Sequence, residues 1–136
     1  MIKATELRIG NWICGVENDF RFANKVEKLE IGKIQVSNNR AGLEEDFFPI
    51  PLTANMLCPE FTKSEHLPIW TASSFHRRIR LEYNSVYWSY YSDFKLLCVF
   101  NYVHELQNIV FALEKIEIEI KPNETNNHTP PTAEML

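Results

Sequence analysis

Residues 101–121 read NYVHELQNIVFALEKIEIEIK, and two different hydrophobic periods meet within them. In the first half, apolar residues recur at intervals of three and four, which places their side chains on one face of an α-helix. These residues are Val103, Leu106, Ile109, Val110 and Leu113. In the second half, Ile116, Ile118 and Ile120 alternate with charged residues, as in a half-buried strand. We therefore expect a helix over 102–115, followed by a strand.

The N-terminal part of the chain shows short strand patterns separated by turn residues. A strand is expected from Trp12, and a hairpin is expected from strands over 25–31 and 33–36 with a bend at Gly32. Short strands joined by tight turns, with no helix between them, favour a small curled sheet of the SH3-like kind.

The middle of the chain divides into an irregular part and a strand-rich part. Residues 40–75 are the least regular, and a short helix beginning at Thr53 is expected there. Residues 78–91 predict a hairpin whose two-residue loop is Asn84-Ser85. The predicted register sorts the side chains cleanly by face. It pairs Leu81 with Trp88 and Ile79 with Tyr90 on the apolar face, and Arg80 with Ser89, Arg78 with Tyr91 and Glu82 with Tyr87 on the other.

The strand expected over 94–100 is apolar on both faces, which predicts a central strand. Together these patterns predict an α+β fold, in which an antiparallel sheet built from hairpins is covered by the helix 102–115. We expect one domain over 1–121, with sub-lobes near 1–39 and 76–121. Residues 122–136 contain three prolines and little apolar content, so they are expected to form a disordered tail.

Composition and charge disfavour several classes of function. The chain has 136 residues and a formal net charge of −4, which disfavours sequence-independent nucleic-acid binding. No apolar run is long enough for a membrane span, and the N-terminus does not resemble a signal peptide, so a cytoplasmic location in a host cell is expected. Cys14, Cys58 and Cys98 are scattered, which indicates reduced thiols. We expect no cofactor and no membrane partner.

Two stretches invite a comparison with metal sites. The residues His104, Glu105 and Asn108 resemble the HExxH zinc motif, but the second histidine is replaced by an asparagine, which is a poor zinc ligand. Glu119 and Lys121 resemble part of a metal-dependent nuclease site, yet no persuasive acidic partner on a neighbouring strand accompanies them. An ordinary solvent-facing edge explains this second pattern better.

Two surfaces are candidates for partner binding. The first is the polar face of the predicted hairpin, formed by Arg78, Arg80, Tyr87 and Tyr91. Arginine and tyrosine are enriched in protein interfaces, and they also bind single-stranded nucleic acid. An ordinary surface with cross-strand cation–π contacts explains the same pattern. The second candidate is a helical arc, for which simple packing under a loop is the alternative. Its residues are His104, Gln107, Asn108 and Phe111.

Three stretches carry a resemblance to a family. ELRIGNWI over 6–13, PIPLT over 49–53 and YVHELQNIVFAL over 102–113 resemble small uncharacterised proteins from phages and prophages of Bacteroidetes. In that family the third stretch forms a late helix, and a Thr-Gly turn follows where this chain has Glu114-Lys115-Ile116. The resemblance implies a mobile-element setting but no activity and no catalytic residues. Some phage proteins of this size and host range are anti-CRISPR proteins, including inhibitors of RNA-guided RNA nucleases.

Three functional hypotheses follow. The leading one is a non-enzymatic phage-type protein that binds and inhibits or modulates a host protein, with a CRISPR effector nuclease or its RNA-bound complex as a candidate target. The second is a nucleic-acid-binding accessory protein that uses the arginine and tyrosine face. The third is a small metal-dependent nuclease.

Overall fold

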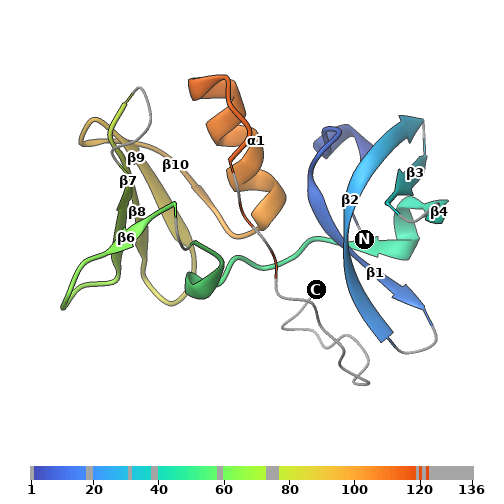
Figure 1. Ribbon diagram of the computed structural model, residues 1–136, viewed down its shortest axis with the longest axis horizontal. Coiled ribbons are helices and arrows are strands. Elements are labelled where there is room, and N and C mark those ends of the chain that lie inside the picture. The colour runs from blue at the N-terminus through green and yellow to red at the C-terminus, as the bar shows by residue number, and fades with distance from the viewer. Residues whose placement is uncertain are drawn as a thin grey trace. The chain divides into compact units, whose positions relative to one another are not determined.

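The structure of the protein is a computed structural model (Figure 1), in which residues 2–17, 20–30, 32–37, 40–57, 60–72, 77–118, 120 and 122 are described. The elements in chain order are η1 (Ala4–Glu6), β1 (Trp12–Glu17), β2 (Phe20–Glu30), β3 (Lys33–Val36), β4 (Arg40–Leu43), η2 (Glu44–Asp46), β5 (Phe47–Phe48), η3 (Ala54–Leu57), β6 (Thr62–Lys63), β7 (Ile69–Ala72), β8 (Ile79–Tyr83), β9 (Trp88–Ser92), β10 (Lys95–Phe100) and α1 (Val103–Glu114). The predictions for the tail 123–136, and those for Cys58, Glu119 and Lys121, lie outside the described residues.

The described strands form two five-stranded antiparallel sheets, and the chain divides into two compact units. The first unit comprises 1–51, 102–104 and 121–136, and the second comprises 52–101 and 105–120. Two antiparallel sheets with one main helix confirm the predicted α+β class. Strands β4, β5, β6 and β7 all lie in the part of the chain that seemed least regular from its sequence.

The first sheet has the strand order β4-β3-β2-β1-β5, with the short helix η2 just before β5. Strand β2 is long enough to pair with β1 through its first half and with β3 through its second half. The register shifts between Val26 and Lys28, where β2 passes from one partner to the other. In this order β1 lies between β2 and β5, and the SH3-like form of this sheet stays a prediction.

The core of the first unit is mostly aliphatic. Alternate residues of β1, β2 and β3 point to one side of the sheet, so their side chains are removed from water together. The buried cluster consists of Ile2, Ile13, Val26, Ile34, Val36 and Phe47. Burial of each such side chain contributes about 1.5–3 kcal/mol before the loss of conformational entropy is subtracted. The strand expected from Trp12 and the hairpin about Gly32 are therefore both present, and Gly32 has the positive φ of 71° that its turn requires.

The second sheet has the strand order β10-β9-β8-β7-β6, which is a simple meander. Its buried face is aromatic: the ring centroids of Trp70 and Trp88 are 5.0 Å apart, and those of Trp88 and Phe100 are 6.4 Å apart. The indole N–H of Trp88 donates to the carbonyl oxygen of Leu52 at 3.2 Å in a buried position. Trp88 therefore both fills the core and fixes the segment that leads into η3.

The hairpin β8–β9 forms where it was predicted, but its register was wrong by two residues. Leu81 lies opposite Tyr90 rather than Trp88, because the loop contains four residues, 84–87, instead of two. The side-chain oxygen of Asn84 accepts hydrogen bonds from the backbone N–H groups of Val86 and Tyr87 at 2.9 and 2.8 Å, which closes this wider loop. A shift of two residues leaves every side chain on its predicted face.

The strand predicted to be central is instead an edge strand. Strand β10 ends the order of the second sheet, and Leu96, Leu97 and Val99 are about half exposed. A strand with apolar residues on both faces is normally buried on both faces, which is why the sequence indicated a central position. In β10 the apolar residues of the outward face are exposed instead.

The prediction of a strand over 116–120 is also wrong, because the described residues of this segment form no strand. Ile118 and Ile120 are nevertheless 5% and 3% exposed, whereas Ile116 is 40% exposed. The backbone N–H of Ile120 donates to the carbonyl oxygen of Ile118 at 3.1 Å, a bond within the segment rather than to a neighbouring strand. The two buried isoleucines of the alternating pattern are thus buried without a ladder of strand hydrogen bonds.

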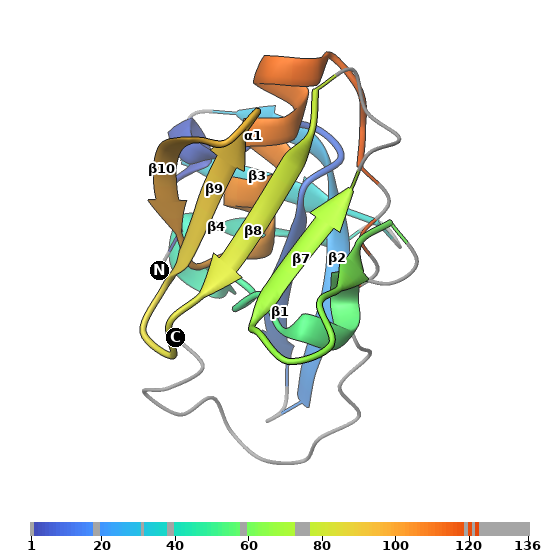
Figure 2. The ribbon, with the colours of Figure 1, turned by 90° about the vertical axis from the view of Figure 1, so that its left-hand side faces the viewer.

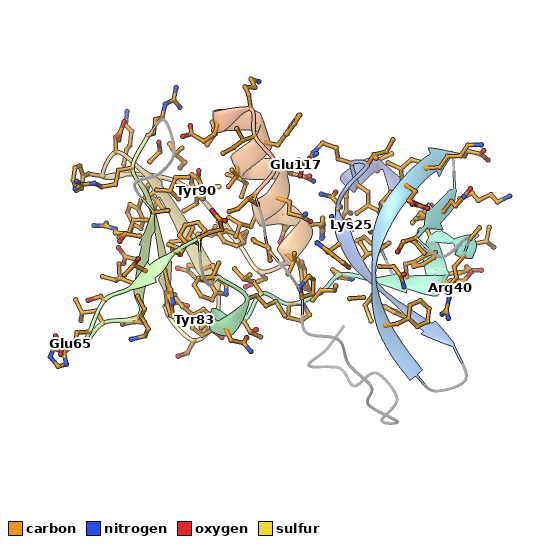
Figure 3. All side chains as sticks on the ribbon, in the orientation of Figure 1. Lys25, Arg40, Glu65, Tyr83, Tyr90 and Glu117 are labelled. Atoms are coloured by element: carbon orange, nitrogen blue, oxygen red, sulfur yellow. The ribbon has the colours of Figure 1, made fainter. Side chains whose placement is uncertain are left out.

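Helix α1 confirms the predicted helix to within a residue at each end. Val103, Leu106 and Val110 are fully buried, as the helical period indicated. Within the second unit, Figure 2 shows the second sheet in front and α1 behind it, and Figure 3 shows Tyr90 on the side of the sheet that faces α1. The helix ends at Glu114, and the next residue, Lys115, has a φ of +61° and donates its backbone N–H to the carbonyl oxygen of Phe111.

Candidate protein-binding surface

The second sheet has one face turned away from α1, which we call the outer face (Figure 2). Residues 79–82 of β8 and all residues of β9 alternate between buried and half-buried, so the half-buried set defines this face. Two rows of side chains cross it from β7 to β10. The first row is Thr71, Arg80, Tyr91 and Leu96, and the second is Ile69, Glu82, Ser89 and Val99.

Arg80 and Tyr91 are already engaged with each other at the middle of the outer face. The guanidinium carbon of Arg80 lies 4.2 Å from the centroid of the Tyr91 ring, within the range of a cation–π contact. Arg80 Nε also lies 2.8 Å from Glu82 Oε2, which forms an ion pair. The charge of Arg80 is therefore paired, and one face of the Tyr91 ring is covered, by residues of the sheet itself.

A β-bulge in β10 determines which side chains reach the outer face. Leu96 lies opposite Tyr91 and Cys98 lies opposite Tyr90, so Leu97 is an extra residue between them. In a regular strand with no bulge, alternation from Val99 would direct Leu96 to the buried face. The bulge instead places Leu96 beside Tyr91 on the outer face. Leu96 and Val99 therefore lie on the same face, at the β10 ends of the two rows.

The result is an exposed apolar surface along β10, which we call the β10 strip. Its members are Phe94, Leu96, Leu97 and Val99, with exposed fractions of 69%, 53%, 44% and 54%. Single exposed apolar residues are ordinary on protein surfaces, but contiguous groups often mark interaction sites. Four such residues within six positions of one strand and its turn make this the largest linear group of exposed apolar side chains in the described second sheet.

Cations lie at the end of the strip where β10 begins. The Arg78 guanidinium lies 5.2 Å from the centroid of the Phe94 ring, and the Arg78 backbone N–H donates to Asp93 Oδ1 at 3.0 Å. Among the described residues, no carboxylate forms an ion pair with this guanidinium. Lys95 is exposed as well. The strip thus combines an apolar centre with a positively charged end.

The structure distributes the residues predicted from sequence over several places. Arg80 and Tyr91 lie on the outer face, and Arg78 lies at its end, so three of the four hairpin residues come together. Tyr87 lies in the loop between β8 and β9 and is 38% exposed. The apolar β10 strip was not among the predicted site residues. Its signal was present in the two-faced apolar pattern of 94–100, which we interpreted as a central strand.

The predicted arc of α1 does not form one exposed patch. His104 and Gln107 are 3% and 2% exposed, and Asn108 is half-buried. The His104 ring stacks near Tyr102 with centroids 6.0 Å apart, and its Nε2 lies 3.9 Å from Glu6 Oε2. Phe111 alone is substantially exposed, at 38%. Packing, which was the alternative explanation for this arc, accounts for the two buried residues.

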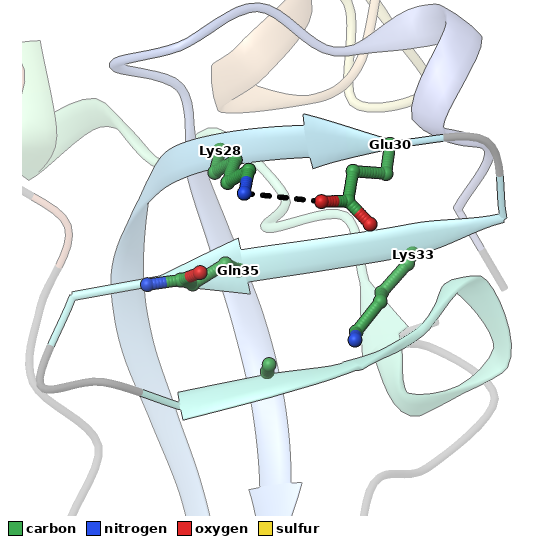
Figure 4. A pocket seen from close by; sticks show the side chains of 5 residues that line it. Lys28, Glu30, Lys33 and Gln35 are labelled. Carbon is green, nitrogen blue, oxygen red and sulfur yellow. Dashed lines mark ion pairs between the residues drawn. The ribbon is translucent and has the colours of Figure 1, made fainter.

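A shallow hollow of about 120 Å³ lies on the first sheet (Figure 4). Its lining residues are Lys28, Glu30, Lys33, Gln35 and Ala41. The ammonium of Lys28 lies 3.1 Å from Glu30 Oε1, and the hydrogen bond and charge of Lys28 lower the pKa of the Glu30 carboxyl, with a smaller effect from Lys33. The carboxylate partly neutralises both lysines, so the hollow has little excess charge with which to hold an anion.

The described residues contain no group of three or more His, Cys, Asp or Glu side chains that could hold a metal ion. Cys14 and Cys98 are free thiols in the described part of the chain. Burial raises the pKa of the Cys98 thiol, and the negative charge of Glu105 raises it further. This thiol is therefore held in its protonated form, which is the less nucleophilic one.

No family model, curated protein or solved structure matches the chain. Within the described residues, no helix is long and apolar enough to cross a membrane. The exposed apolar strip beside arginine and tyrosine is the feature of the described residues with the clearest chemical meaning.

Proposed function

We propose that this protein is a non-enzymatic binding protein that docks on another protein through the outer face of its second sheet. The observation that carries the proposal is the β10 strip, in which a bulge directs leucine side chains toward solvent. Water-exposed leucine and valine cost free energy in the isolated protein, and that cost is recovered when a partner covers them. A binding interface would therefore explain why these apolar side chains are exposed in the isolated protein.

The composition around the strip is that of an interface centre. Interfaces are enriched in tyrosine and arginine, and a few buried side chains supply most of the binding free energy. Tyr91 lies directly beside Leu96, and Arg78 lies over Phe94. Arg80 holds the Tyr91 ring in place, so the tyrosine loses little further side-chain entropy on binding.

The charges favour a partner with acidic groups beside an apolar surface. Arg78 has no ion-pair partner among the described residues, and Lys95 is exposed at the same end of the strip. The whole chain has a formal net charge of −4, so this end differs in sign from the average surface. Carboxylates on the partner would pair with these cations, which mainly increases the association rate and fixes orientation.

The same geometry is less suited to nucleic acid. Base stacking requires an accessible aromatic face, and one face of Tyr91 is occupied by the guanidinium of Arg80. Phosphate binding uses several cations together, and of the three near the strip Arg80 is already paired with Glu82, which leaves only Arg78 and Lys95. The aliphatic side chains of Leu96 and Val99 offer neither a stacking platform nor a hydrogen bond to a base.

The resemblance to phage and prophage proteins supports a partner in a bacterial host. On that basis the protein would inhibit or modulate a host protein by covering part of its surface. A CRISPR effector nuclease, alone or in its RNA-bound complex, belongs to the target classes to be tested first.

A comparative pull-down from host lysate tests the proposal. The baits are the parent, the variant Leu96→Glu/Val99→Glu, and the control Leu67→Glu/Val86→Glu, with lysate used before and after nuclease treatment. Leu67 and Val86 are exposed apolar residues of the same two types that lie outside the β10 strip, at 54% and 75% exposure. Thermal melts check that all three baits are folded.

We expect the parent and the control to retain the same captured protein, and Leu96→Glu/Val99→Glu to lose it. The capture should survive nuclease treatment. Equal capture by Leu96→Glu/Val99→Glu would rule out the β10 strip as the docking site. Loss of capture after nuclease treatment would instead support a nucleic-acid bridge.

A further inference from the structure

We infer that the exposed edge of β10 pairs with β10 of a second copy, so that two second sheets join about a two-fold axis. This inference concerns the edge of the sheet and a second copy of the chain, and it goes beyond the docking function proposed for the outer face. It is testable with the purified protein alone, so its result does not depend on whether a target exists.

The edge of β10 has the properties that promote strand pairing. Among the strands that the structure describes, β9 is the one partner of β10, so its other edge has backbone groups without a strand beside them. The stretch 96–100 contains no charged residue and no proline. Natural edge strands usually carry such residues, because an apolar edge is a template for pairing with another chain.

The bulge makes this edge self-complementary. Leu96 and Val99 are three positions apart, which in a regular strand would place them on opposite faces. The extra residue between them brings both to the outer face. In an antiparallel pair, directly opposite residues share a face. A two-fold axis between Leu97 and Cys98 therefore sets Leu96 of each copy opposite Val99 of the other.

The charges near the edge are compatible with this register. Lys95 of one copy lies opposite Phe100 of the other, so the two lysines are five strand positions apart, or about 16 Å along the strand. That separation exceeds the Debye length of about 8–10 Å at ordinary salt, so their repulsion is largely screened. Any register that brought the two lysines together would lose this advantage.

The paired segment is short, so the association of the two copies is expected to be weak. An interface of one strand and its flanking side chains lies at the small end of protein interfaces, and such contacts are weak and concentration-dependent. Lys95 and the bulge are also features that limit edge pairing. The two β10 strips would meet on one side of the joined sheet, which would double the docking surface while leaving it accessible.

Sedimentation velocity over about 10 µM to about 1 mM, which spans the affinities of weak interfaces, tests the inference. The parent should move from the mass of one chain toward that of two as concentration rises. Leu96→Lys and Val99→Glu should each stay at the mass of one chain. An equimolar mixture of the two variants should associate more strongly than either alone, because the new lysine lies opposite the new glutamate in the proposed register.

The control is Val86→Lys, which introduces the same charge in the loop between β8 and β9 and should associate like the parent. Amide hydrogen exchange in β10 of the parent, which should slow at the high concentration, gives a second measurement that needs no variant. The inference fails if the parent remains one chain at the highest concentration. It also fails if Val86→Lys weakens association as much as Leu96→Lys does. It fails as well if the mixture of Leu96→Lys and Val99→Glu associates no more strongly than either variant alone.

Discussion

The ring of Phe22 lies so close over Gly15 that a Cβ on Gly15 would be 2.5 Å from the ring atom Cε2. The two residues are directly opposite each other in the pairing of β1 with β2. On the Phe22 ring lies the guanidinium of Arg40, 4.1 Å from the ring centroid. The aromatic ring thus replaces the missing side chain of the glycine, which is a known way to stabilise glycine within a sheet.

This contact predicts that Gly15→Ala destabilises the first unit by about 1–3 kcal/mol, the usual cost of overpacking. The measurement is urea denaturation of the parent and the variant. In a Phe22→Leu background the same change should cost clearly less, because the smaller side chain leaves room for the new methyl group. Equal costs in both backgrounds would show that the ring is not the obstacle.

The second prediction concerns the end of α1. Lys115 has a φ of +61°, a conformation that costs a residue with a Cβ about 1–2 kcal/mol relative to glycine. Lys115→Gly should therefore raise the free energy of unfolding by about 1 kcal/mol, and Lys115→Ala should not. Chemical denaturation of the three proteins compares them. A destabilised Lys115→Gly variant would mean that the lysine side chain contributes more than its backbone costs.

Leu106 is fully buried on α1, and Leu67 is 54% exposed in the loop before β7. Leu106→Ala should reduce stability by about 2–5 kcal/mol, because it removes packed methyl groups and leaves a cavity. The same substitution at Leu67 should change stability by no more than about 0.5 kcal/mol. Denaturant midpoints measure both. Similar small losses at the two positions would contradict the assignment of α1 to the core.

Burial raises the pKa of the Tyr90 hydroxyl above its ordinary value, and the negative charge of Glu114 raises it further. The unfolded chain, with a tyrosine pKa of about 10, therefore releases this proton before the folded protein does. Stability linked to Tyr90 is fully present below pH 10 and falls as pH rises above it.

The parent should accordingly lose more stability between pH 8 and pH 11 than Tyr90→Phe, since phenylalanine has no proton to release. Urea denaturation at the two pH values gives the four free energies needed. Lysine titration affects both proteins alike, so the difference isolates Tyr90. Parallel losses in the parent and the variant would show that Tyr90 is not the titrating group.

Much of the fold follows from local patterns in the sequence. The helical period of Val103, Leu106 and Val110 and the alternation in β8 and β9 predicted the elements and their buried faces correctly. The hairpin register did not follow, because the hydrogen bonds of the Asn84 side chain close a four-residue loop that leaves the same faces buried. Face patterns are insensitive to a shift of two residues.

Positions within a sheet were harder to predict than faces. The apolar residues of β10 indicated a central strand, whereas β10 ends the sheet and the bulge at Leu97 turns Leu96 to the outer face. A bulge depends on pairing with the neighbouring strand, so no local period reveals it. The same limit explains the candidate site. Arg78, Arg80 and Tyr91 were predicted as surface residues, whereas the apolar strip beside them required knowledge of which strand ends the sheet.

The central claim is that the β10 strip docks on a protein, and a titration of the protein captured by the parent tests it most directly. Purified target is titrated with the parent, with Leu96→Glu/Val99→Glu and with Leu67→Glu/Val86→Glu, each at low and high salt. The account predicts binding at least about tenfold weaker for the β10 variant, unchanged binding for the control, and only a shallow salt dependence. Equal affinities for all three proteins would contradict it.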